Sequence, residues 1–227
     1  MQLSAATLYK GNHNMNRKIA ENWLCLSGII AVIFYFLHII LGTMHYPGYN
    51  NLAQAVSDLT AMDSPSYMIA SRFTTIYGAL SCLCCTIAFL LLNKSEKKVF
   101  RTGILLYTIM NWISFTGYTL FPLSGNGFQG TVQDIFHFYV VTISVVILAI
   151  ASLIMIFIGG IKVKRTQWIS ICSLTALFFM CAGSIGTGIV PREYFGLAER
   201  LSTFSVVIFT GLLGYFGFLY DNTAKKA

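Results

Sequence analysis

Only a few side chains in this apolar sequence could carry out chemistry, and two of them form a close pair. Asp134 and His137 are three residues apart, so on a helix they share one face and the carboxylate can orient the imidazole. His45 ends a long apolar stretch, and Asp58 lies in the polar segment that follows it. Hydrolytic zinc sites use three such ligands and keep one position open for water. We therefore consider His45, Asp134 and His137 as ligands of a divalent metal such as zinc. Asp58, Asp134 and His137 are the candidate catalytic groups.

A second set of polar residues could instead hold an anionic ligand. It consists of Ser57, Arg72, Arg192, Glu199 and Arg200. Arg72 falls well inside an apolar stretch, where a charge is costly unless it is paired, hydrated or functional. Arginine binds phosphate through two parallel hydrogen bonds, so Arg192 or Arg200 could clamp a headgroup. Simpler roles remain open, because Arg72 can extend to the lipid headgroups and Glu199 with Arg200 can form a solvated helix start.

The elements that must position these residues are six long apolar stretches. They run from Trp23 to Met44, Pro65 to Leu92, Gly103 to Pro122, Ile135 to Ile158, Gln167 to Val190 and Leu201 to Tyr220. Each provides the roughly 20 residues that a helix needs to cross a hydrocarbon core of about 30 Å. The composition agrees, because 56% of the residues are hydrophobic and only 10% are charged. We predict an all-α protein with six transmembrane helices arranged as three hairpins.

The basic residues predict the orientation of these spans. Of the 15 Lys and Arg residues, 12 fall on one side: Lys10, Arg17, Lys18, Lys94, Lys97, Lys98, Arg101, Lys162, Lys164, Arg165, Lys225 and Lys226. Cytoplasmic flanks retain positive charge, so both termini are expected in the cytoplasm of a protein of the plasma membrane. Anionic lipid headgroups account for the net charge of +7, and no nucleic-acid partner is expected. The candidate site residues then lie on the outer side, with membrane lipids as the expected partners.

The domain organisation follows from the same pattern. We predict a cytoplasmic amino-terminal segment over 1–22, a transmembrane domain over 23–220 and a cytoplasmic tail over 221–227. The first outer loop is the longest, and apolar residues at helical spacing predict a short amphipathic helix within 49–62. Glycines in the last two spans, such as Gly183, Gly188 and Gly214, predict close helix contacts, since small residues let backbones approach in lipid.

Three segments resemble a known family. They are Tyr46-Pro47-Gly48-Tyr49 with its continuation to Ser57-Asp58-Leu59, Phe121-Pro122 with the glycine-rich loop and His137, and Gly196-Leu197-Ala198-Glu199-Arg200. Together they are similar to the prokaryotic integral-membrane family called domain of unknown function 998, over almost the whole chain. The six-span layout is also like that of the Frag1, DRAM and Sfk1 proteins.

The resemblance implies a fold but no settled activity. It points to Ser57, Asp58, His137 and Arg200, with Glu199 where members more often have a neutral polar residue. Members also commonly carry an acidic residue just after the proline of the second outer loop, where this chain has Leu123-Ser124.

Three functions are therefore compared. The first is non-enzymatic binding of a lipid headgroup or small solute by the outer polar cluster. The second is a membrane-embedded, metal-dependent lipid hydrolase or transferase. The third is a proton- or ion-coupled transporter, against which the spans show no inverted halves and few prolines near their middle.

Overall fold

The computed structural model describes residues 20–92 and 97–224, and the regular elements of these residues are all helical. The long helices are α2 (Ser27–Met44), α3 (Tyr67–Leu92), α4 (Lys98–Leu120), α6 (Ile143–Gly160), α7 (Gln167–Ile189) and α8 (Phe195–Ala224). The short helix α5 (Val132–Ile135) continues through a π-helix, η2 (Phe136–Thr142), into α6. Two 3₁₀ helices, η1 (Val56–Thr60) and η3 (Arg192–Tyr194), lie in connections. The predicted all-α fold is confirmed.

Five helical segments of the described residues are long and apolar enough to cross a membrane. They are Ala20–Met44, Tyr67–Leu92, Val132–Gly160, Gln167–Ile189 and Arg192–Tyr220. Large apolar side chains such as Ile147, Ile158 and Phe178 are exposed on them, as expected of surfaces that face lipid. The protein is therefore a multi-pass membrane protein. Helix α4 has 23 residues and packs against α3 and α6, but it is less apolar, so the arrangement of six spans stays a prediction.

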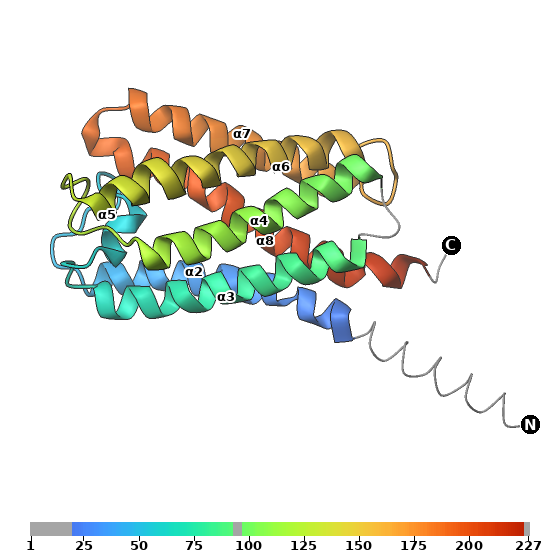
Figure 1. Cartoon of the computed structure of the whole chain (residues 1–227), viewed down its shortest axis with the longest axis horizontal. Coiled ribbons are helices and arrows are strands. Elements are labelled where there is room, and N and C mark those ends of the chain that lie inside the picture. Colours follow the sequence, from blue (N-terminus) through green and yellow to red (C-terminus); the bar gives the residue numbers. More distant parts are fainter. Residues whose placement is uncertain (1–19, 93–96, 225–227) are drawn as a thin grey trace, which may run out of the picture.

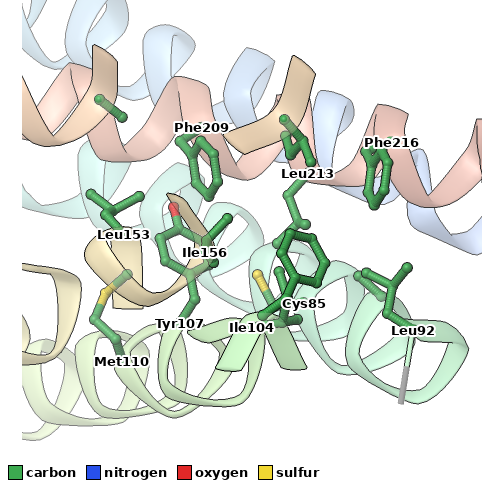
Figure 2. Close-up of a cluster of buried hydrophobic side chains, with 14 of the residues drawn as sticks. Cys85, Leu92, Ile104, Tyr107, Met110, Leu153, Ile156, Phe209, Leu213 and Phe216 are labelled. Carbon is green, nitrogen blue, oxygen red and sulfur yellow. The ribbon is translucent and has the colours of Figure 1, made fainter. Parts of the chain in front are cut away.

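The helices pack along one another around a core formed mainly by α3, α4, α6 and α8. Figure 2 shows Phe209, Leu213 and Phe216 of α8 facing side chains from the other three helices. Tyr107 of α4 is fully buried there, and its hydroxyl lies 2.7 Å from the Val206 carbonyl and 2.8 Å from the Thr210 hydroxyl. This pairing satisfies a polar group that would otherwise be costly inside the bundle.

Close packing at glycine holds the last two helices in place. A Cβ atom at Gly183 would come within 2.4 Å of the Ser202 backbone nitrogen, and one at Gly214 within 2.4 Å of the Cys25 carbonyl oxygen. These contacts confirm the predicted roles of Gly183 and Gly214. At Gly188, by contrast, a Cβ atom would meet nothing within 4 Å. Without a hydrophobic force between helices in lipid, such contacts supply much of the association.

Figure 1 shows that the connections between α2 and α3, α4 and α5, and α7 and α8 lie at one end of the bundle, opposite the first and last described residues. We call this the loop end, formed by loop 1 (45–66), loop 2 (121–131) and loop 3 (190–194), and we call the opposite end the terminal end. The amphipathic helix predicted within 49–62 is not confirmed. The chain there forms turns and the five-residue η1, in which Val56 and Leu59 are buried in the bundle.

Candidate functional site

Arg200 ties helix α8 to loop 1. Its Nη1 donates to the carbonyl oxygens of Gln54 at 2.8 Å and Gly196 at 3.0 Å. Its Nη2 donates to the Tyr49 hydroxyl at 2.8 Å and to Asn51 Oδ1 at 3.1 Å. The side chain is only 7% exposed, so a buried guanidinium is solvated here by four neutral oxygens of the protein.

Tyr49 connects Arg200 to the backbone of loop 1. Its hydroxyl accepts from Arg200 and donates to the Ala55 carbonyl oxygen at 2.6 Å. Burial raises the pKa of Tyr49 to about 12, against the opposing effect of Arg200, so the hydroxyl keeps the proton that it donates. Loop 1 is therefore held in one conformation by a chain of hydrogen bonds that begins in α8.

Two carboxylates reinforce the same loop. Glu199 Oε2 accepts from the Val56 backbone nitrogen at 3.1 Å. Asp58 Oδ2 accepts from the Ala55 nitrogen and Oδ1 from the Gly127 nitrogen, both at 3.0 Å, which joins loop 1 to loop 2. Burial raises the pKa of Asp58, although both hydrogen bonds and the charge on Arg200 oppose this shift. The main work of these two groups is to satisfy backbone donors that the loops leave unpaired.

Asp134 plays the same part in loop 2, with a fully buried side chain. Its Oδ1 accepts from the Ser124 backbone nitrogen at 2.9 Å, and the Ser124 hydroxyl lies within 2.9 Å of both carboxylate oxygens. Its Oδ2 also accepts from the nitrogens of Gln129 at 3.0 Å and Thr131 at 3.2 Å. The Thr131 hydroxyl in turn accepts from the Asp134 nitrogen, which completes a capping box at the start of α5.

His137 is nearly buried beneath loop 2 and does not bond to Asp134. Its Nδ1 lies 2.8 Å from the Phe121 carbonyl oxygen, which can only accept, so Nδ1 carries a proton. The ring packs against Tyr118 with centroids 4.8 Å apart. The Thr142 hydroxyl donates to the His137 carbonyl oxygen at 2.8 Å, within the π-helix η2. The predicted pair is thus close in sequence, but each member serves a different part of loop 2.

The remaining candidates lie apart from this network. His45 is exposed at the end of α2, and its Nδ1 lies 2.8 Å from the Leu41 carbonyl oxygen. Ser57 is half-buried in η1, next to Asp58. Arg72 on α3 and Arg192 in η3 are exposed, and neither has a hydrogen-bond or ion-pair partner among the described residues.

The zinc hypothesis gains no support from these positions. No group of three His, Cys, Asp or Glu side chains in residues 20–92 and 97–224 could hold a metal ion. His45, Asp134 and His137 belong to separate contacts instead of a shared one, so we derive no chemistry through a metal. The loop end has a network of buried charges that hold the loop backbones.

Several members of this network were not predicted from the sequence. Tyr49, Asn51 and Gln54 carry no charge, and nothing in their spacing points to an arginine almost 150 residues away. The role of Asp134 had a usable signal, because Thr131-Val132-Gln133-Asp134 has the spacing of a capping box.

The comparison with protein families now has a structural context. A family model described as a protein of unknown function (DUF998) matches residues 29–215, which include all long helices in whole or in large part and all three loops. The chain belongs to the DUF998 family. The predicted resemblance is therefore confirmed, and the buried network of the loop end lies within the region that defines DUF998. No curated protein and no solved structure matches the chain.

Proposed function

We propose that this DUF998 protein binds the headgroup of an anionic lipid at its loop end, without chemistry. The observation that carries the proposal is that some polar groups of the loop end have hydrogen-bond partners and others do not. The carboxylate oxygens of Asp58, Asp134 and Glu199 accept hydrogen bonds from backbone nitrogens and a hydroxyl group. Arg72 and Arg192, in contrast, are exposed and unpartnered among the described residues. Asp63 and Glu193 are exposed at the loop end too, but Arg72 and Arg192 are the exposed groups there that suit a phosphate.

The position of Arg72 supports a lipid as the ligand. It lies near the start of α3, between Met68 and Ile76, which are 63% and 41% exposed on the same face. An arginine on a lipid-facing stripe extends its charged group toward the phosphates while its stem stays among apolar side chains. A guanidinium fork also matches the geometry of a phosphate group.

Exposed aromatic side chains support a position of the loop end at a membrane surface. Phe128, Tyr139 and Tyr194 are 51%, 61% and 45% exposed in or beside loops 2 and 3. Aromatic rings of this kind gather where the hydrocarbon meets the headgroups. With the distribution of basic residues, this supports six spans in the plasma membrane, both termini in the cytoplasm and the loop end outside.

The test compares retained lipid in purified protein by native mass spectrometry, with phosphatidylglycerol or phosphatidylcholine supplied in mild detergent. We expect Arg72→Gln to bind one phosphatidylglycerol fewer, or about tenfold more weakly, because one charge-assisted contact is lost. Arg72→Lys should bind better than Arg72→Gln, and Thr75→Gln on the same exposed face should match the wild type.

An enzyme would give the opposite pattern. His137→Ala and Asp134→Asn would then abolish turnover of a supplied lipid in folded protein, while Arg72→Gln would only weaken its binding. Equal retention of phosphatidylglycerol by the wild type and Arg72→Gln would overturn headgroup binding at this position.

A further inference from the structure

The terminal end of the bundle contains two arginine donors that the described residues leave without an acceptor. The Nε atoms of Arg101 and Arg165 are buried and have no hydrogen-bond partner. Buried donors of folded proteins are almost always paired, and an orphaned one indicates a missing water or ion. For a charged guanidinium the penalty is larger, so an acceptor at both positions is strongly favoured.

These two arginines come from elements that touch. Arg101 lies in the first turn of α4, next to Phe100, and a Cβ atom at Gly160 would come within 2.7 Å of the Phe100 ring. Gly160 ends α6, and its carbonyl oxygen accepts from Thr166, the residue after Arg165, at 2.8 Å. Figure 1 likewise shows the start of α4 beside the connection between α6 and α7.

The end of α8 holds Arg165 in place. Its guanidinium carbon lies 3.5 Å from the centre of the Tyr220 ring, and its Nη2 donates to the Tyr220 carbonyl oxygen. Phe216 links this point back to α4, because its ring centroid is 5.6 Å from Tyr220 and 6.3 Å from Phe100. The fork of Arg165 is therefore oriented before any ligand binds, which lowers the entropy cost of binding.

The two segments that carry Arg101 and Arg165 are positively charged, although Asp221 follows Tyr220 in the sequence. Lys97, Lys98, Lys162 and Lys164 are exposed on the same two segments, and 97–102 and 161–166 contain no acidic residue. Glu96, the adjacent acidic residue in the sequence, lies outside the described residues. Helices α4 and α7, each of 23 residues, also begin here, so their positive ends add to the attraction for an anion.

We propose that Arg101 and Arg165 together bind one phosphate group, supplied by an anionic phospholipid of the leaflet at the terminal end. Guanidinium forks match the geometry of a phosphate, whereas lysines act on it as point charges. The four lysines therefore attract the phosphate, and the two arginines fix its position. Basic sites between transmembrane helices bind headgroups of this class. The ligand chemistry is a phosphate, and its source is a lipid or free inorganic phosphate. This site lies opposite the loop end and does not depend on the function proposed there.

The experiment replaces each arginine by lysine, which removes the guanidinium fork and keeps the positive charge. Thermal unfolding is followed for Arg101→Lys, Arg165→Lys and the wild type while phosphatidylglycerol is added to detergent micelles, because a ligand of the folded state raises the Tm. We expect at least about tenfold weaker phosphatidylglycerol binding in each variant, as a charge-assisted contact is lost. Thr102→Ser, adjacent to Arg101 and exposed on α4, is the matched control and should bind like the wild type.

The alternative explanation is a general preference for positive charge on the cytoplasmic side. It predicts that both arginine-to-lysine variants bind phosphatidylglycerol like the wild type, and this result would overturn the proposal. If neither variant folds, the Tm of the wild type is compared between the two lipids. Equal Tm values with phosphatidylglycerol and phosphatidylcholine would also overturn the proposal. Millimolar inorganic phosphate that raises the Tm and displaces the lipid would support the site and assign free phosphate as its ligand. Native mass spectrometry separates this site from the loop end, since Arg72→Gln and Arg101→Lys should each remove a different lipid.

Discussion

Replacing Arg200 by methionine should release loop 1 without unfolding the bundle. Methionine keeps much of the apolar stem and removes the guanidinium. The change deletes three hydrogen bonds to loop 1, from Nη1 to Gln54 and from Nη2 to Tyr49 and Asn51. The loop keeps its own contacts through Asp58 and through the bond from the Leu197 nitrogen to the Leu52 carbonyl oxygen at 3.0 Å. We therefore expect local opening instead of global unfolding.

The magnitude follows from the burial and the number of bonds. Each hydrogen bond to a charged group contributes about 1.5–3 kcal/mol, but the three bonds share one side chain and are not additive. Leaving a buried acceptor unsatisfied costs about 1–3 kcal/mol, so the three acceptors of loop 1 together, counted as less than fully additive, cost about 3–5 kcal/mol. Since about 1.4 kcal/mol corresponds to a factor of ten, the opening equilibrium of loop 1 should rise by a factor of about 100 to 4,000.

Hydrogen exchange followed by mass spectrometry measures this opening directly, in detergent or in a lipid bilayer. Amides of residues 49–62 should lose protection by the expected factor, and amides of α4 and α6 should not change. Arg192→Met is the matched control, because Arg192 is exposed in η3 and has no partner among the described residues. Unchanged exchange of loop 1 in Arg200→Met would refute the reasoning, as would equal loss of protection throughout the bundle.

Three further predictions concern other parts of the molecule. Gly183→Ala should lower the free energy of unfolding by about 1–3 kcal/mol, because its Cβ meets the Ser202 backbone, while Gly188→Ala in the same helix should not lower it; equal Tm values in the two variants would contradict this packing. Asp134→Asn should destabilise loop 2 by about 1–3 kcal/mol, since the new NH₂ group cannot accept from the donors that face one of the two carboxylate oxygens; thermal unfolding measures this, and a wild-type Tm would disprove it. Because burial raises the pKa of Asp58, its folded state favours the proton, so its contribution to stability is full below the unfolded pKa of 3.8 and is lost as pH rises through the raised value. Asp58→Asn should therefore flatten the pH dependence of Tm above pH 3.8, and an unchanged slope would count against it.

The helices could largely be predicted from the sequence, because each is a long apolar stretch bounded by polar or glycine-rich segments. Agreement is good for α7, predicted to start at Gln167 and observed from the same residue. The disagreements have local causes. Helix α8 begins at Phe195, six residues before the predicted apolar stretch, because Glu199 and Arg200 are satisfied by loop 1 and can lie within the helix. The amphipathic helix expected in loop 1 is not confirmed, and side chains from α8 satisfy backbone groups of this loop instead.

The sequence by itself determined the class of protein, the family and the set of unusual residues, because apolar length, charge distribution and short segments are local properties. Only the tertiary structure decided what those residues do. The orientation of each helix about its axis places Arg200 inside the bundle and leaves Arg72 and His45 exposed, although all three lie at the loop end. The partners of Arg200 in loop 1 are about 150 positions away, so no periodicity could reveal them. A charge buried in the bundle or the bilayer is costly, and the contacts that offset this cost depend on which segments the fold brings together.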